Sequence, residues 1–168
     1  MGWSVHRLNL IPNYGICPLE KLAQQVADYV DRVFAPDQKI DLVGFSMGGL
    51  VTRYYLQRLG GAERVQRYVS ISAPNQGTVV AYALPLQGIV QMRPESEFIQ
   101  NLNQDMDRSL QSLKVTTLWT PFDLLIIPPE SSQMPVGKDV SIPVLLHPWM
   151  LKDRRCLDQV TQALREPV

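Results

Sequence analysis

A serine between glycines is the residue of this sequence best suited to nucleophilic chemistry. The segment Gly44-Phe45-Ser46-Met47-Gly48-Gly49 follows an apolar run and precedes a helical pattern. A chain that turns from strand to helix within a few residues strains the serine backbone, and side chains two positions before and after would collide. Glycine at positions 44 and 48 is expected to remove that collision. The motif predicts Ser46 as a nucleophile at a helix N-terminus, and the alternative is a glycine-rich turn with an idle serine.

A serine hydroxyl needs a general base, and the chain has two histidines. His147 follows an expected strand at 140–146, at the edge where parallel sheets place their active sites. Asp123 follows an expected strand at 114–119, and a carboxylate there could hold the tautomer of the base. The chain order Ser46, Asp123, His147 is the one expected for a nucleophile elbow on an α/β sheet. His6 lies inside an expected strand at 3–10 and is interpreted as structural.

Each of these assignments has an alternative. Asp123 could simply cap the turn after Pro121, and His147 could be a loop histidine fixed by Pro148. Glu130 and Asp139 are rival acids because both lie between the same two expected strands.

The elements expected around these residues alternate between strand and helix. Apolar residues at spacings of three and four predict a helix at 18–34, and further helices are expected at 47–59, near 95–103 and at 153–165. Short apolar runs predict strands at 3–10, 39–45, 64–72, 114–119 and 140–146. The pattern predicts an α/β fold, with a mostly parallel sheet, helices on both faces and one domain over 1–168. The long apolar connection at 78–112 is expected to form a cap or lid that lines an acyl pocket over Ser46.

The composition is that of an ordinary globular protein. Of the 168 residues, 45% are hydrophobic and 19% are charged, and 16 basic residues balance 16 acidic ones. With no basic run, nucleic acid is not an expected partner. No apolar stretch is long enough to span a bilayer, and the first residues lack a signal-peptide pattern, which favours a cytoplasmic location. Cys17 and Cys156 have no metal-type spacing and are expected to be reduced thiols.

The elbow, the segment Ser72-Ala73-Pro74-Asn75-Gln76-Gly77-Thr78, the Asp123 turn and the His147 loop together resemble bacterial triacylglycerol lipases and related esterases of the α/β-hydrolase superfamily. The resemblance implies acyl transfer to Ser46 from a small-molecule or lipid ester, without a metal or organic cofactor. It also implies that the backbone N–H of Met47 is one oxyanion donor. Pro148 departs from the family pattern, in which a small residue often follows the histidine.

The family usually supplies a second oxyanion donor from a His-Gly segment that ends an earlier strand, and this sequence contains no such segment. We therefore expect a partial α/β-hydrolase fold that lacks its first strands, with Met1 as an internal methionine or the gene truncated. The favoured function is a serine carboxylic-ester hydrolase. The alternatives are an acyltransferase or thioesterase with the same triad, and an impaired fragment or pseudo-enzyme.

Overall fold

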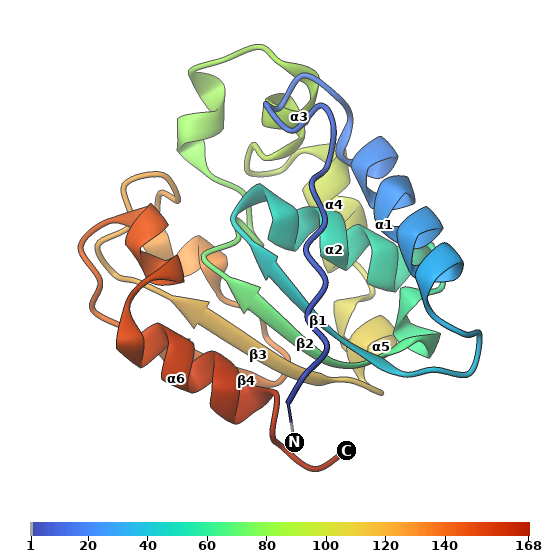
Figure 1. The fold of residues 1–168 in the computed structure, drawn as a ribbon. Helices are drawn as coiled ribbons and strands as arrows, with labels where there is room; N and C mark the ends of the chain where they lie inside the picture. The colour runs from blue at the N-terminus through green and yellow to red at the C-terminus, as the bar shows by residue number, and fades with distance from the viewer. Residues whose placement is uncertain (1) are drawn as a thin grey trace.

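Four parallel strands form the frame of the chain, and the computed structural model describes residues 2–168 (Figure 1). The strands are β1 (Ile40–Phe45), β2 (Val65–Ile71), β3 (Lys114–Trp119) and β4 (Lys138–Ser141). They lie in the order β1-β2-β3-β4, and every neighbouring pair is parallel. The carboxyl ends of all four strands therefore meet at one edge of the sheet. This arrangement confirms the predicted α/β fold.

One face of the sheet is covered by helices that share the larger hydrophobic core. These are α1 (Leu19–Val33), α2 (Met47–Arg58), α4 (Glu97–Asn103) and α5 (Met106–Leu110). Helix α1 forms because its apolar residues recur at spacings of three and four, and Leu19, Leu22 and Val26 are buried. Helix α2 lies between α1 and α4, so its sides are buried against helices as well as against the sheet.

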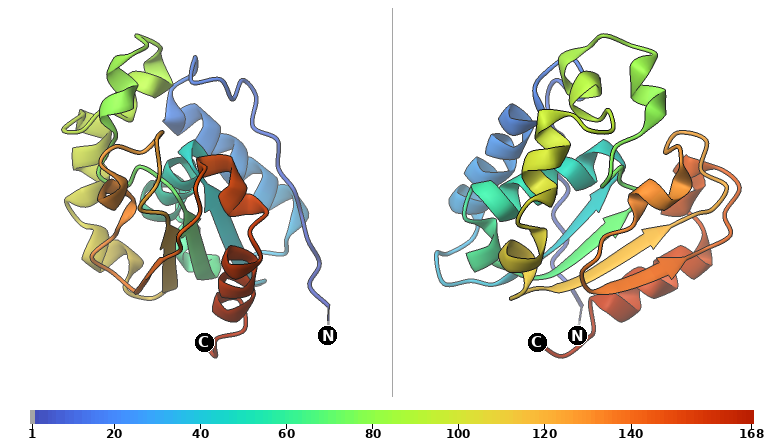
Figure 2. Two further views of the ribbon diagram at one scale, coloured as in Figure 1. Left: turned by 90° about the vertical axis from the view of Figure 1, so that its left-hand side faces the viewer. Right: turned by 180° about the vertical axis from the view of Figure 1, so that it is seen from behind.

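The opposite face carries α6 (Arg154–Ala163), which packs on a second, smaller core with Val69, Leu118 and Cys156 (Figure 2). Helices therefore cover both faces, as predicted. The remaining short elements are η1 (Gly61–Glu63), η2 (Val79–Tyr82), α3 (Gln87–Gln91), η3 (Pro129–Ser132) and η4 (His147–Leu151). Within residues 2–168 no helix combines the length and the apolar character needed to cross a bilayer.

Two expected strands differ from the structure. Residues 3–10 form no strand, because they pair with no other strand, and they run as a mostly exposed strap (Figure 2). Two contacts attach this strap to α1. A hydrogen bond of 2.9 Å joins His6 Nδ1 and the Tyr29 hydroxyl, and the backbone of Ile11 forms hydrogen bonds with the Gln25 side chain. The strand expected at 140–146 lies earlier in the chain, because β4 begins at Lys138 and ends at Ser141. It stops shortly before Pro143, which has no N–H to continue the ladder.

Segment 78–112 divides into two parts. Residues 78–92 contain η2 and α3 and rise beyond the carboxyl ends of the strands (Figure 1). By contrast, α4 and α5 place Phe98, Ile99 and Leu102 in the larger core against α2. The cap over Ser46 was predicted for residues 78–112. It stays a proposal for residues 78–92 alone, since α4 and α5 belong to the core.

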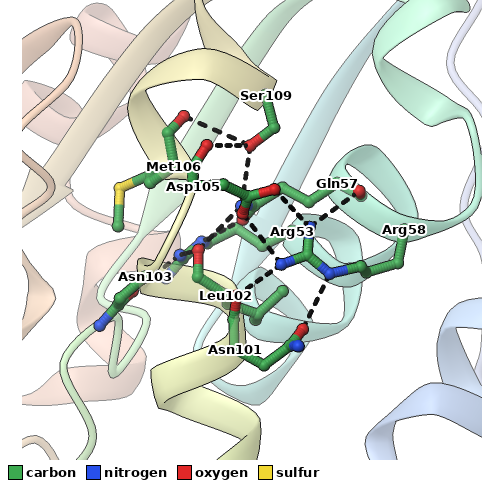
Figure 3. A network of polar contacts seen from close by, with 9 residues as sticks. All are labelled: Arg53, Gln57, Arg58, Asn101, Leu102, Asn103, Asp105, Met106 and Ser109. Atoms are coloured by element: carbon green, nitrogen blue, oxygen red, sulfur yellow. Dashed lines mark hydrogen bonds and ion pairs between the residues drawn. The ribbon is translucent and has the colours of Figure 1, made fainter.

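A buried arginine connects α2 to this second part (Figure 3). Arg53 is fully buried and donates to the backbone oxygens of Asn75 and Leu102 and to the side chain of Asn103, at 2.9–3.2 Å. Burial lowers the pKa of Arg53 to about 10. Nearby, Arg58 forms a two-pronged ion pair with Asp105 at 2.9 and 3.1 Å. These contacts fix α2 to the segments that follow β2.

Candidate active site

Ser46 lies at the sharp turn between β1 and α2. Its backbone has φ 55° and ψ −131°, a conformation that residues other than glycine rarely adopt. The turn is held by hydrogen bonds from Ser46 N to Ile71 O and from Gly49 N to Ser46 O, both 2.9 Å. Such strain persists only where the surroundings enforce it, and here it lifts the serine off the end of the sheet.

Of the two elbow glycines expected to relieve a collision, the structure confirms one. A side chain at Gly44 would overlap Thr52 Oγ1 and the backbone of Gly49, so glycine is required there as predicted. At Gly48, however, a Cβ would meet no atom within 4 Å, so the predicted collision two residues after the serine is wrong. The close approach is instead at Gly49, where a Cβ would overlap Ala73 at the end of β2.

Met47 is the first residue of α2. The first N–H groups of a helix have no acceptor within the helix, and they lie at the positive end of its dipole. The Met47 N–H therefore lies at the end of α2 that favours negative charge, and its role as an oxyanion donor stays a prediction.

His147 and Asp123 come from neighbouring loops at the carboxyl edge of the sheet. Asp123 follows β3, and His147 opens η4 beyond β4. The distance from His147 Nδ1 to Asp123 Oδ2 is 2.7 Å, and both side chains are buried. The expected contact between them is present, although their catalytic roles stay a prediction.

Asp123 also caps its own turn, so the alternative interpretation of this residue is part of the same arrangement. Its Oδ1 accepts hydrogen bonds from Leu125 N at 2.9 Å and from Ile126 N at 3.0 Å. Burial by itself would raise the pKa of Asp123. The hydrogen bonds from His147, Ile126 and Leu125 outweigh that effect, so the pKa lies below its usual value. The carboxylate is ionised at neutral pH and able to accept from an imidazole N–H.

The His147 ring also contacts the residue that precedes the serine. The ring packs on Phe45, the residue before Ser46, with centroids 4.8 Å apart. Its Nε2 is buried and has no hydrogen-bond partner among residues 2–168. A buried nitrogen without a partner is costly, and a catalytic role is one physical reason for which a protein keeps such an atom. Pro148 fits because it stands in the first turn of η4, where a missing N–H costs nothing.

The rival residues lie elsewhere. The Asp139 carboxylate accepts from Trp119 Nε1 at 2.9 Å and from Gln133 Nε2 at 3.0 Å. Glu130 is exposed on η3. His6 contacts α1 rather than either loop of the site.

One residue at the site was not found by sequence analysis. Thr120 donates to Val144 O and accepts from Val144 N, which joins the end of β3 to the chain that leads to His147. The only sequence signal was a threonine directly before Pro121. Its partner is 24 positions away, so the sequence could not indicate the contact.

Exposed apolar side chains surround the two loops. The Asp123 loop presents Phe122, Leu124 and Leu125, and the His147 loop presents Leu145, Leu146 and Trp149, all between 41% and 69% exposed. Single exposed hydrophobic residues are ordinary, whereas a group of them around one site indicates an apolar ligand or surface.

The same fold occurs in solved structures. The mature form of lipase BlEst2 from Bacillus licheniformis has a TM-score of 0.66 and 13% identity, over 87% of this chain and 72% of the lipase. A gene product of Listeria innocua has a TM-score of 0.67 and 14% identity, over 90% and 68%. Aspergillus fumigatus lipase B has a TM-score of 0.61 and 20% identity, over 79% of this chain but only 35% of the lipase. The chain thus has the α/β-hydrolase fold.

A comparison with family models is more specific. The model for palmitoyl protein thioesterase matches residues 14–105, which is more than half of the chain. The protein belongs to the palmitoyl protein thioesterase family and is a hydrolase of the α/β type. No curated protein matched in a direct sequence comparison.

Proposed function

We propose that the protein hydrolyses acyl esters through an acyl-enzyme on Ser46. In this proposal His147 is the general base, Asp123 orients it, and the Met47 N–H binds the oxyanion. The observation that carries the proposal is the 2.7 Å contact between the buried Asp123 and His147 side chains, on loops at the same sheet edge as a strained serine elbow.

The chemistry follows from these positions. Ser46 Oγ attacks the acyl carbonyl while His147 Nε2 accepts its proton, and Asp123 stabilises the imidazolium that forms. The carbonyl oxygen becomes negative next to the Met47 N–H at the start of α2. When the tetrahedral intermediate collapses, the bond to the leaving group breaks and His147 protonates that group. A water molecule then repeats the sequence, which releases the carboxylic acid and restores Ser46.

The acyl group is expected to be a lipid chain. The apolar side chains on the Asp123 and His147 loops offer an alkyl chain more contact than a small polar acyl group would use. Both the family membership and the lipases that share the fold are consistent with such a substrate.

A thioester is a second candidate substrate, and the family model favours it. The same residues would act, and the leaving group would be a thiolate. Hydrolysis of p-nitrophenyl palmitate can be compared with hydrolysis of palmitoyl thioesters, including an S-palmitoylated peptide. A higher kcat/KM for the thioesters would identify a thioesterase, and added alcohol that diverts the acyl group to a new ester would identify an acyltransferase.

Ser46→Ala tests the proposal itself. It should abolish nearly all hydrolysis, because triad-dependent catalysis needs the nucleophile. A fluorophosphonate should label the native protein at Ser46, and peptide mass mapping identifies the residue. Ser109→Ala is the matched control and should leave labelling intact. Ser109 accepts a hydrogen bond from Gln57, near the C-terminal end of α2, whereas Ser46 precedes the N-terminal end of this helix. Full turnover by Ser46→Ala would refute the nucleophile, and absent labelling in the native protein would favour the impaired-fragment alternative.

A further inference from the structure

Thr78 has an unusual set of contacts for a residue at the start of a connection. It follows Gly77, is 4% exposed, and stands at the N-terminus of η2. Its hydroxyl donates to Leu125 O and accepts from Ile127 N, both at 2.9 Å. These partners lie 47 and 49 positions away, in the turn that follows Asp123.

The two peptide groups that Thr78 binds belong to the turn that binds Asp123. The N–H of Leu125 donates to Asp123 Oδ1, while the C=O of the same residue accepts from Thr78. In addition, Val79 N donates to Ile127 O at 3.0 Å. The turn is therefore held from both sides, by the Asp123 carboxylate within it and by Thr78 from outside.

Thr78 also closes the base of the protruding segment 78–92. Its N–H donates to Met92 O at 2.8 Å, so the two ends of the segment are joined at this residue. Gly77 allows this approach, because a Cβ there would overlap the backbone of Pro94 and its φ is +86°. The base of the segment and the turn of the acid thus meet at one buried hydroxyl.

From this arrangement we propose that Thr78 is a positioning residue for the catalytic acid. The proposal rests on the proposed function of Asp123. The Thr78 hydroxyl fixes the C=O of Leu125 and the N–H of Ile127. The peptide that contains the Leu125 C=O also contains the Ile126 N–H, which donates to Asp123 Oδ1 and draws this oxygen into the turn. Oδ2 is then left facing His147 Nδ1 at 2.7 Å. Without the hydroxyl, the part-buried Leu125 C=O and Ile127 N–H lose a partner, as does Val80 N–H at the start of η2, and the turn can rotate away from this geometry.

Thr78→Val tests the proposal, because valine keeps the shape of threonine and removes only the hydroxyl. We expect kcat to fall roughly tenfold to a hundredfold, as for a displacement of about an ångström in a catalytic group, with little change in KM. Thr78→Ser keeps the hydroxyl and should restore most of kcat. The matched control is Thr117→Val, since Thr117 is equally buried and its hydroxyl has no partner within residues 2–168. That variant should keep native kcat.

A second readout does not depend on turnover. A proton shared between a buried imidazole and a carboxylate gives a far-downfield proton NMR signal, and Asp123→Asn identifies it by its loss. We expect Thr78→Val to weaken or shift this signal and Thr117→Val to preserve it. If Ser46→Ala were fully active, the proposed function would fail, but the signal would still test the connection from Thr78 to Asp123.

Val79→Pro provides an independent variant in case Thr78→Val does not fold. It removes only the N–H that bonds Ile127 O, at the first position of η2, where proline is tolerated. It should change kcat and the NMR signal in the same direction as Thr78→Val. A folded Thr78→Val or Val79→Pro protein with native kcat and a native signal would overturn the proposal. So would a Thr78→Ser protein as impaired as Thr78→Val.

Discussion

Asp123 and His147 bind each other through one carboxylate oxygen, while the second oxygen of Asp123 is occupied by its own turn. This division fixes both the position and the direction of the carboxylate, because neither oxygen can leave its partners without breaking a buried hydrogen bond. The His147 ring is thereby held with Nδ1 towards the acid, and the same ring packs on Phe45, the residue before Ser46.

Asp123→Asn should therefore impair catalysis far more than it changes the fold. The amide can still accept in the turn, but it can neither stabilise an imidazolium nor enforce the tautomer, so we expect kcat to fall by about 10³- to 10⁴-fold. Steady-state hydrolysis of a soluble ester measures this. Asp139→Asn is the matched control, since that carboxylate bonds Trp119 and Gln133 instead. Equal losses in the two variants would contradict the assignment of the acid.

The lowered pKa of Asp123 gives a signed prediction for stability. The folded pKa lies below the unfolded value of about 3.9. At pH values between these two pKa values the folded state binds fewer protons than the unfolded state, so the free energy of unfolding rises with pH. The contribution is fully present above the unfolded pKa and is lost as pH falls through the folded one. The melting temperature of the native protein should exceed that of Asp123→Asn at pH 7, and the gap should narrow below about pH 4. A gap that widens on acidification would show the opposite shift.

The elbow glycines should respond differently to alanine. Gly48→Ala adds a methyl group in open space within a helix, so we expect stability to be unchanged or raised by up to about 1 kcal/mol. Gly49→Ala drives a methyl group into Ala73 and should destabilise by about 1–3 kcal/mol, as overpacking does. Urea unfolding of the two variants makes the comparison, and the reverse order would contradict the steric account.

Arg53→Met should be among the most destabilising single changes in the chain. It would leave the buried Asn75 oxygens without the Arg53 donor and would remove one of the two donors of Leu102 O and the bond to Asn103, for a loss of about 3 kcal/mol. Chemical denaturation measures the loss, and Arg154→Met, at a side chain 94% exposed, should leave the midpoint unchanged. A midpoint in Arg53→Met equal to that of the control would show that the network in Figure 3 adds no net stability.

The sequence by itself determined the local elements and the types of residue at the site. Helix α1 and strand β3 follow from periodicity and apolar runs that a short window contains, and the elbow follows from the glycine spacing around Ser46. Chain order then favoured Asp123 and His147, which needed only the rule that parallel strands end at one edge.

Tertiary structure decided everything that depends on a partner distant in sequence. Residues 3–10 have the composition of a strand, but a strand exists only when another strand accepts its hydrogen bonds, and residues 2–168 provide none for them. The need for glycine at Gly49 comes from Ala73, not from the elbow motif. The hydrogen bonds of Thr78 span 47 and 49 positions, so no local pattern could assign that hydroxyl to the turn of Asp123.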